Sequence, residues 1–360
     1  MAPAPGRQER IPVAVLGATG SVGQRFVSLL DKHPWFELTT VAASAKNAGR
    51  PYGEAARWDL DHPLPESTAA LVLTDATSPV VERLVFSALD AEVAGEIEAA
   101  CAAAGALVVS NASSHRMDRD VPLLVPEVNP EHLDLLELQT WKGGLITNPN
   151  CSTIGLVLAL APLHRAFGVR RVHVVTMQAL SGAGSTGVPA MAALDNLIPY
   201  IQGEEEKLAT ETARILGRLS DGAVHPAPIT VSAQCNRVAV LDGHTECVSI
   251  ELDTPATRDE ILAAWEGFRG APQELDLPSA PAHPTLYLDA PDAPQPRLHR
   301  DLEAGMACIL GRLQPCPVLG WRFVCLSHNT LRGAAGGALL AAELAVASGS
   351  SPLALPMPQL

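Results

Sequence analysis

The sequence predicts an α/β protein of two domains, a doubly wound parallel sheet followed by an α+β domain. First, 360 residues with 47% hydrophobic content are enough for two cores, and no internal repeat is visible. Second, strand-like and helix-like segments alternate over residues 1–150, as they do around a parallel sheet. Third, longer β-branched runs follow from residue 151, so we place the second domain at residues 151–328.

The first segment, IPVAVLGATGSVGQRFVSLLDKHP, contains a β-branched run, a glycine-rich turn and a helix-period stretch that stops before Pro34. Gly17, Gly20 and Gly23 are spaced so that the backbone can approach a pyrophosphate and the helix N-terminus can receive its charge. This arrangement predicts a Rossmann-type dinucleotide site. The alternative is a plain tight turn between strand and helix.

The end of the second predicted strand, ELTTVAAS, indicates which dinucleotide binds. An NAD enzyme usually has Asp or Glu there to hold the ribose 2′-hydroxyl. This sequence has Ser44, Lys46 and Asn47 instead, a hydroxyl, a cation and an amide that suit a 2′-phosphate. We therefore predict NADP, although an isolated loop lysine is more often simply solvated. The runs RLVFSAL and ALVVSNAS predict further strands on either side of the helical AGEIEAACAAAG.

A cysteine stands where an apolar helix begins, in NPNCSTIG. The run IGLVLALAPL opens on Ser152 and Thr153, which read as capping residues, so Cys151 is expected at or just before the helix N-terminus. The helix dipole and the free first-turn N–H groups favour a thiolate there, which predicts a lowered thiol pKa. The alternative is a small buried residue at a helix start.

Two β-branched runs in the second domain, ITVSAQCNRVAV and HTECVSIELD, are joined through Asp242-Gly243, a dipeptide typical of two-residue hairpins. A hairpin would pair Arg237 with Val248 and would project Arg237 and His244 from the same side of the ribbon. Before them come the strand VRRVHVVTMQALSG, a Gly/Ser-rich loop and the helical EEEKLATETARILGRL.

Prolines are frequent from residue 270 to residue 300, which predicts a long loop or an excursion from the sheet. A last strand, WRFVCLSHN, and an alanine-rich helix from Gly333 close the chain.

Composition excludes several classes. The first ten residues contain no apolar segment of a signal peptide, and no run approaches eighteen apolar residues, so we expect a cytoplasmic protein without membrane association. Seven cysteines without a C-x-x-C pair suit reduced thiols, and no metal is expected. The net charge of -14 is spread without a basic cluster, which argues against nucleic-acid binding.

Eight motifs in order resemble one family, aspartate-β-semialdehyde dehydrogenase, particularly its archaeal and fungal-type branch. They span nearly the whole chain and read GATGSVGQRF, SNASSHRM, PEVNPEHL, NPNCST, MQALSGAG, GEEEKLATET, NRVAVLDGHTECVSIEL and NTLRGAAGG. The resemblance implies NADPH-dependent, reversible conversion of L-4-aspartyl phosphate to L-aspartate 4-semialdehyde through a cysteine thioester. It also implies that the second domain is catalytic and dimerising, as a homodimer or homotetramer, and that residues 329–360 return to the first domain.

The resemblance assigns catalytic roles at matching positions. Cys151 would be the nucleophile and His244 the acid/base residue, whose ordinary pKa of about 6.5 suits proton transfer in both directions. Gln178 and the N–H groups at the helix start would hold the thioacyl oxygen. Without the family, His244 reads as a surface residue beside a turn and Gln178 as a polar strand end.

The same resemblance assigns substrate and cofactor contacts. Arg237 would bind the α-carboxylate in a forked geometry, while Glu204, or its neighbours Glu205 and Glu206, would pair with the α-ammonium. On spacing alone, this acidic run is a solvated helix start. The phosphate would be bound by Arg116, Lys207 and Asn150. The expected cofactor-binding residues are Gly17, Thr19, Gly20, Ser21, Val22, Gly23, Ser44, Lys46, Asn47, Ser87, Ser181, Gly182 and Asn329.

Three other functions are weighed. N-acetyl-γ-glutamyl-phosphate reductase usually surrounds its cysteine with Pro-Gly and Tyr, whereas Asn150 and Ser152 flank Cys151 here. A malonyl-CoA reductase would keep the nucleophile, the histidine and NADP binding. A catalytically silent binding subunit would have no reason to keep Cys151, His244 and Arg237 together.

Overall fold

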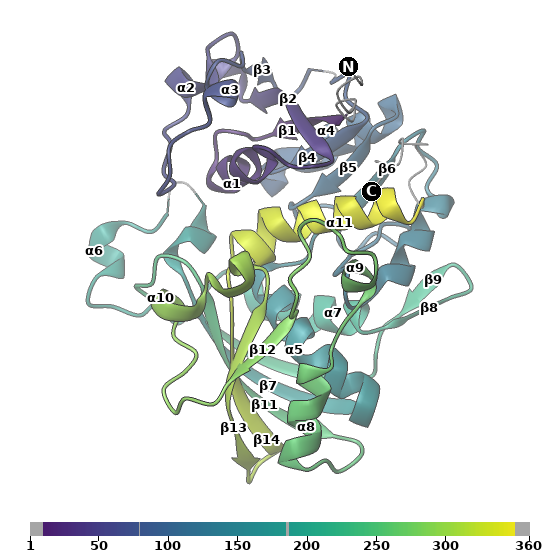
Figure 1. Ribbon diagram of the computed structural model, residues 1–360, viewed down its shortest axis with the longest axis vertical. Coiled ribbons are helices and arrows are strands. Elements are labelled where there is room, and N and C mark those ends of the chain that lie inside the picture. The colour runs from purple at the N-terminus through teal and green to yellow at the C-terminus, as the bar shows by residue number, and fades with distance from the viewer. Residues whose placement is uncertain (1–9, 79, 185–186, 350–360) are drawn as a thin grey trace, which may run out of the picture.

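The computed structural model describes residues 10–78, 80–184 and 187–349. These contain two six-stranded sheets, one above the other in Figure 1, and a small two-stranded sheet. The first sheet is parallel throughout and has the strand order β3-β2-β1-β4-β5-β6. Its strands are β1 (Ile11–Leu16), β2 (Phe36–Ala43), β3 (Thr74–Asp75), β4 (Leu84–Ser87), β5 (Leu107–Ser110) and β6 (Gly144–Thr147).

Helices cover both faces of this sheet, as the predicted doubly wound fold requires. Alternate residues of β1 point to opposite faces. Val13 and Val15 belong to one core with α1 (Ser21–Leu30) and α11 (Gly336–Ala347), whereas Ala14 and Leu16 pack with α4 (Ala91–Ala104). The first core therefore contains the end of the chain, and α11 runs along the underside of the sheet (Figure 1).

The shorter elements of the first domain lie in the connections between strands. They are η1 (Ala45–Asn47), α2 (Tyr52–Ala55), α3 (Glu66–Ala69) and η2 (Pro130–Leu138).

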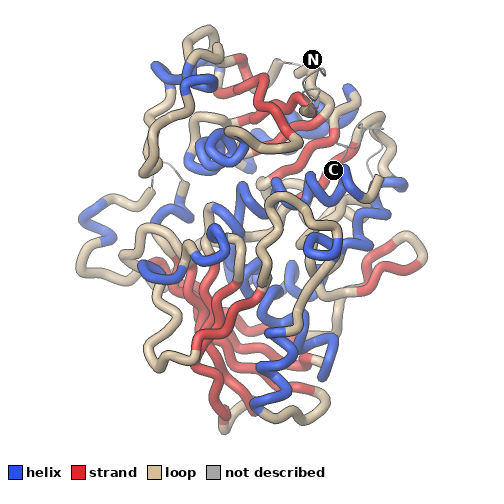
Figure 2. The backbone as a smooth tube through the Cα atoms, in the orientation of Figure 1, coloured by secondary structure: helices blue, strands red, loops and turns tan. Residues whose placement is uncertain are grey.

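The second sheet is mixed and has the order β10-β7-β11-β14-β13-β12. Its strands are β7 (Val169–Gln178), β10 (Thr230–Arg237), β11 (His244–Leu252), β12 (Thr285–Leu288), β13 (Cys308–Cys316) and β14 (Gly320–Ser327). Its core side packs against α5 (Cys151–Phe167), α7 (Glu204–Ile215) and α8 (Arg258–Glu266), and these helices lie beside the strands in Figure 2. The remaining elements are η3 (Leu180–Ala183), α6 (Ala190–Ala193), β8 (Arg218–Ser220), β9 (Ala223–His225), α9 (Ala271–Glu274), α10 (Pro296–His299), η4 (Leu302–Gly305) and η5 (Leu331–Ala335).

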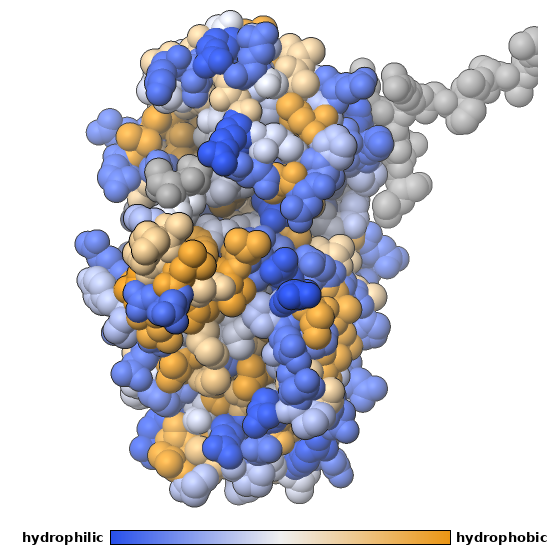
Figure 3. Space-filling model, turned by 90° about the vertical axis from the view of Figure 1, so that its left-hand side faces the viewer, coloured by the Kyte–Doolittle hydropathy of each residue, from blue (hydrophilic) through white to orange (hydrophobic). Residues whose placement is uncertain are grey.

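The opposite face of the second sheet is open. Arg171, His173 and Cys247 project from it and are exposed. Nearby, the segment through α6 also exposes large apolar side chains, with Met191 at 89% and Leu194 and Tyr200 at 65%. Figure 3 shows apolar residues gathered in the middle and lower parts of that view, which belong to the second domain.

The predicted hairpin at Asp242-Gly243 is wrong. Strand β7 lies between β10 and β11, parallel to the first and antiparallel to the second. Arg237 is therefore in register with Gln178 and not with Val248. The reason is that the chain after Arg237 continues alongside the end of β7, where the Leu180 amide donates to the Val240 carbonyl. A two-residue turn cannot form while this segment has another backbone partner.

The proline-rich segment is more regular than predicted, because β12 adds a parallel edge strand to the second sheet beside β13. Strands β3, β6, β8, β9 and β13 were not predicted from the sequence either. The final helix does pack on the first domain as expected, but it ends at Ala347, and residues 350–360 lie outside the described part. Within the described residues, no helix is long and apolar enough to span a membrane.

Candidate active site

Cys151 is the first residue of α5, as the sequence predicted, but the cap is Asn150 and not Ser152 or Thr153. The Asn150 Oδ1 accepts hydrogen bonds from the Ser152 and Thr153 amides at 3.0 and 3.2 Å. The two hydroxyls are fully buried. The asparagine thus satisfies two first-turn donors and fixes where the helix begins.

His244 is the first residue of β11, and its imidazole contacts the Cys151 thiol. Its Nε2 lies 3.1 Å from the Cys151 Sγ. The Ala179 amide donates to the ring Nδ1 at 3.0 Å. Since Nδ1 accepts this bond, the neutral ring carries its proton on Nε2 and directs it toward sulfur. The tautomer follows from this hydrogen-bond pattern.

The thiol pKa is not lowered in the free protein, which corrects the sequence prediction. Burial raises the pKa of Cys151 to about 12, and the charge of Glu204 adds to this effect. The nearby Arg116 and Arg237 act in the opposite direction, but they are outweighed. Burial also lowers the pKa of His244 to about 3. Both groups are therefore neutral at pH 7, because desolvation exceeds the effect of the helix start.

Glu204 is at the centre of a buried hydrogen-bond network. Its carboxylate accepts from Asn150 Nδ2 at 3.0 and 2.8 Å, from Gln178 Nε2 at 3.2 Å and from Lys207 Nζ at 3.1 Å. Of the three adjacent glutamates, Glu205 binds the Cys235 amide and Glu206 is exposed, so Glu204 is the one that faces the thiol region. Two predicted ligand contacts, Asn150 and Gln178, are thus already bonded to Glu204.

Two arginines complete the arrangement. Arg237 ends β10 and donates to the Ala179 carbonyl at 2.7 Å, which places it beside His244 across the end of β7. A Cβ on Gly182 would lie 2.8 Å from Arg237 Nη1 and 3.1 Å from His244 Cε1, so a larger residue there would displace the Arg237 guanidinium group. Arg116 lies on the first-domain side. The thiol cluster comprises Arg116, Asn150, Cys151, Gln178, Glu204, Lys207, Arg237 and His244.

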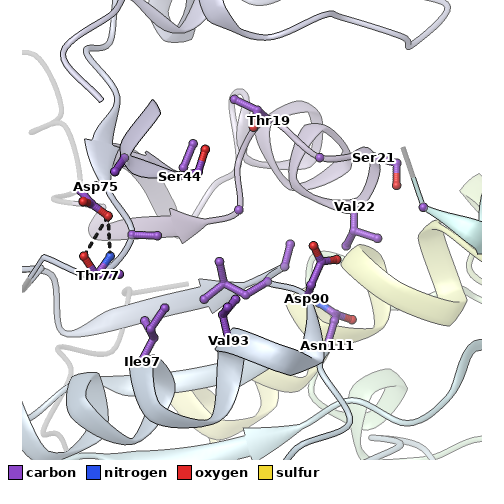
Figure 4. A pocket seen from close by; sticks show the side chains of 18 residues that line it. Thr19, Ser21, Val22, Ser44, Asp75, Thr77, Asp90, Val93, Ile97 and Asn111 are labelled. Carbon is purple, nitrogen blue, oxygen red and sulfur yellow. Dashed lines mark hydrogen bonds between the residues drawn. The ribbon is translucent and has the colours of Figure 1, made fainter. Parts of the chain in front are cut away.

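The glycine-loop pocket, a cavity of about 700 Å³, lies at the carboxyl ends of β1, β2 and β4 (Figure 4). A Cβ on Gly17 would meet the Ala88 carbonyl oxygen at 2.4 Å, and one on Gly23 would meet the Gly17 oxygen at 2.2 Å. Helix α1 starts here without a side-chain cap, which leaves its first N–H groups for an anion. The pocket therefore fits a dinucleotide in size and chemistry. The predicted residues that line it are Gly17, Thr19, Gly20, Ser21, Val22 and Ser44.

The other predicted cofactor residues are not part of the described lining. Lys46 and Asn47 lie on η1 with the lysine exposed, and Ser87 is buried at the end of β4. Asn329 Nδ2 donates to Ser181 Oγ at 2.8 Å, and its Oδ1 accepts from the amide of Gly243, the residue before His244. The remaining two are Gly23, which serves the close packing described above, and Gly182, which covers Arg237 and His244.

Several lining residues were missed by the sequence analysis. Asp75 ends β3, next to Ser44, and its Oδ1 accepts from both the amide and the hydroxyl of Thr77 (Figure 4). Asp90 follows β4 and lines the same pocket, as does Asn111 after β5. The common signal is position, because each of them lies at or shortly after the carboxyl end of a parallel strand, where ligands of such sheets bind.

A dinucleotide pocket, together with a half-buried cysteine in contact with a buried histidine, defines a thiol-dependent oxidoreductase of the semialdehyde dehydrogenase class. Family models agree: the semialdehyde dehydrogenase NAD-binding domain matches residues 12–136, and the semialdehyde dehydrogenase dimerisation domain matches residues 160–332. The chain belongs to the aspartate-semialdehyde dehydrogenase family, as the following relatives show.

The similarity extends over nearly the full length of these relatives. The aspartate-semialdehyde dehydrogenase of Methanothermobacter thermautotrophicus is 53% identical over 342 residues, covering 93% of this chain and 98% of the relative. That of Saccharomyces cerevisiae is 45% identical over 353 residues, covering 92% and 97%. A crystal structure from Candida albicans with NADP superimposes with a TM-score of 0.88 at 42% identity, covering 95% and 100%. Both the archaeal and the fungal resemblance are thereby confirmed.

Proposed function

We propose that this chain catalyses the reversible, NADPH-dependent reductive dephosphorylation of L-4-aspartyl phosphate to L-aspartate 4-semialdehyde. The observation that carries the proposal is the 3.1 Å contact between the Cys151 Sγ and the His244 Nε2, within a cluster that also holds Arg237 and Glu204. A thiol with a hydrogen-bond donor beside it suits thioester chemistry. The opposite charges of Arg237 and Glu204 match the carboxylate and the ammonium group of an amino acid.

The chemistry proceeds through a thioester. The Cys151 sulfur bonds to the β-acyl carbon, and the C–O bond to phosphate breaks. The thiol proton leaves with the phosphate. When bound in the glycine-loop pocket, NADPH would supply one hydride to the thioester carbon. The His244 Nε2–H stabilises the negative charge on the acyl oxygen by a hydrogen bond. Cleavage of the C–S bond then releases the aldehyde, and the sulfur takes up one proton from solvent, which restores the cysteine. One acyl phosphate, one hydride and one proton thus yield one aldehyde and one phosphate.

Substrate contacts follow from the charges in the thiol cluster. Arg237 binds the α-carboxylate of the substrate, and Glu204 binds the α-ammonium. Asn150 and Gln178 hold the Glu204 side chain in place through their hydrogen bonds to its carboxylate. Lys207 and Arg116 bind the phosphate. The free protein already pairs Lys207 with Glu204 at 3.1 Å, so substrate binding exchanges this contact for one with each end of the substrate.

NADP specificity rests on Ser44, which lines the pocket, and on the charge of Lys46, which is exposed on the adjoining η1. The exposed apolar segment around Met191 and Tyr200, with the open face of the second sheet, supports a homodimer as the minimal assembly. All seven cysteines are free, which supports a cytoplasmic location.

One pair of assays tests the proposal. The purified enzyme should reduce NADP when given aspartate semialdehyde and phosphate, and omitting phosphate should abolish the rate. In parallel, NADPH oxidation with malonyl-CoA should be slower than with aspartyl phosphate. Faster turnover of malonyl-CoA would favour the acyl-CoA reductase alternative, and no turnover of either substrate would favour the silent binding subunit.

A further inference from the structure

Glu211 is a buried carboxylate with no role in the chemistry described above. It lies on α7, and only 2% of its surface is exposed. Glu204, Lys207 and Glu211 are separated by three and four positions, so they share one face of the helix, the face that meets the start of α5. The first two residues bond to each other, whereas Glu211 reaches elsewhere.

Each oxygen of Glu211 binds a different part of the site. Oε1 accepts from Arg116 Nη1 at 3.0 Å, and Oε2 accepts from the Asn150 amide at 2.7 Å. Asn150 immediately precedes the nucleophile and caps its helix. A single rigid carboxylate therefore links the arginine of the first domain to the peptide that carries the thiol.

Arg116 is held in a state that is ready for an anion. A second bond, from Nη2 to the Asn111 carbonyl at 2.7 Å, fixes the plane of its guanidinium group. Its Nε is buried, and within the described residues it has no hydrogen-bond partner. A buried donor without a partner is costly unless a ligand satisfies it. Glu211 and Asn111 thus orient the guanidinium group while leaving donors unused.

We propose that Glu211 is a positioning residue that fixes the phosphate-binding guanidinium of Arg116 relative to the Cys151 thiol. The proposal rests on the proposed function, in which phosphate departs from the carbon that the sulfur attacks. That step needs the phosphate oxygens and the sulfur at a fixed separation, since small misplacement lowers the rate of such a reaction greatly. Glu211 sets this separation because it binds both groups.

The first test is the Glu211→Gln variant, which keeps the shape but loses one acceptor. In the oxidative direction, the KM for phosphate should rise about tenfold or more, with much smaller changes in the KM for aspartate semialdehyde and NADP. Glu206→Gln, an exposed site on the same helix, is the matched control and should leave all three values unchanged. A purely structural role would lower thermal stability and change the three KM values alike, and this outcome would overturn the proposal.

A second measurement does not need turnover. Inorganic phosphate should protect Cys151 from alkylation by iodoacetamide, followed by mass spectrometry of the Cys151 peptide. The phosphate concentration for half protection should be about tenfold higher in Glu211→Gln than in the wild type. Equal concentrations in the two proteins would overturn the proposal. If the wild type binds phosphate but does not reduce NADP, the proposed function fails. The alkylation measurement still decides the role of Glu211 in that case.

The third measurement asks whether Glu211 acts through Arg116. In an Arg116→Gln background, Glu211→Gln should have no further effect on the half-protecting phosphate concentration. Multiplicative effects of the two substitutions would contradict the proposal. The double variant removes both charges of a buried pair, so it remains testable even if the single variant, which leaves Arg116 without its counter-charge, does not fold.

Discussion

The glycine-loop pocket is shaped mainly by backbone, whereas the thiol cluster is built from charged side chains that bond to one another. In the pocket, Gly17 and Gly23 have no room for a side chain. In the cluster, Glu204 alone accepts hydrogen bonds from three different side chains. The pocket is therefore formed before its ligand arrives, while the cluster must exchange internal contacts for contacts with the substrate.

This difference teaches how each site tolerates change. A backbone site fails when an added atom occupies the space of the ligand or of the chain. A side-chain site fails when one charge is left without its partner, because a buried, unpaired charge is costly. Substitutions should therefore separate the two regions by which kinetic constant they alter.

The largest effect is expected from Cys151→Ser. A serine hydroxyl is not ionised at neutral pH, and the neutral His244 beside it does not accept its proton readily, so turnover should fall by roughly 10⁴-fold or more. Binding of NADPH, measured by fluorescence titration, should be unchanged because no residue of the thiol cluster lines the pocket. Appreciable turnover by the serine variant would refute the nucleophile.

Gly17→Ala should damage the pocket and leave the thiol cluster intact. The new Cβ would lie 2.4 Å from the Ala88 carbonyl oxygen, and φ at this residue is +72°, so the strain should be on the order of 1–3 kcal/mol. The KM for NADPH should rise by one to two orders of magnitude, about the factor that this strain implies. Gly49→Ala is the control, since φ is +81° there but the Cβ meets nothing within 4 Å. Equal KM values in the two variants would show that the close approach is irrelevant.

Glu204→Gln should act on the cluster alone. Losing the charge that pairs with the substrate ammonium should lower kcat/KM for aspartate semialdehyde by ~2 kcal/mol, about thirtyfold. The KM for NADP should not change. Aldehydes without an amino group should be oxidised at nearly the wild-type rate, and an equal loss on both kinds of aldehyde would exclude recognition of the ammonium.

The pH dependence of alkylation compares two half-buried cysteines whose thiol pKa values are shifted in opposite directions. Because burial holds the pKa of Cys151 near 12, its thiolate fraction and its alkylation rate should rise about tenfold for each pH unit from 6 to 9. For Cys316, burial acts in the opposite direction, but hydrogen bonds from the Leu319 and Val318 backbone lower its pKa. In the free enzyme, iodoacetamide should therefore label Cys316 first at pH 7. Rapid, pH-independent labelling of Cys151 would indicate a resting thiolate.

The smallest effect is expected from Lys46→Ala. The lysine is exposed on η1 and is not in the described lining of the pocket, so its charge reaches a 2′-phosphate through solvent. The KM for NADP should rise about threefold, the size of a screened surface charge effect, and the KM for NAD should stay constant. Equal changes with both dinucleotides would mean that Lys46 does not sense the 2′-phosphate.

The sequence predicted the backbone site better than the side-chain site. Glycine spacing after a strand is a local signal, and Gly17, Gly20 and the helix after them lie where it placed them. The thiol cluster joins residues from distant segments, and only the family resemblance gathered them in advance. Nothing local revealed that β7 separates β10 from β11, because strand order depends on which backbone partner is available.

The thiol pKa was mispredicted for a related reason. The start of a helix, which lowers a thiol pKa, is visible in the sequence. The burial that raises the pKa of Cys151 depends on residues from distant segments of the chain. Gly333 of η5, for example, approaches so closely that an added Cβ would lie 2.8 Å from the Cys151 Cβ. No pattern around residue 151 contains that contact.

The position of α11 affects how the molecule can be made. Its apolar residues fill the core under the first sheet, so that core stays incomplete until the last helix has been synthesised. Roughly 190 residues separate β6 from α11, and at roughly 5–20 residues per second the ribosome needs about 10–40 s to add them. During this time the nascent first sheet exposes the part of its apolar face that α1 leaves for α11. A fragment that ends near residue 150 should therefore aggregate, whereas one that joins residues 10–150 to residues 330–349 through a linker has the means to close that core.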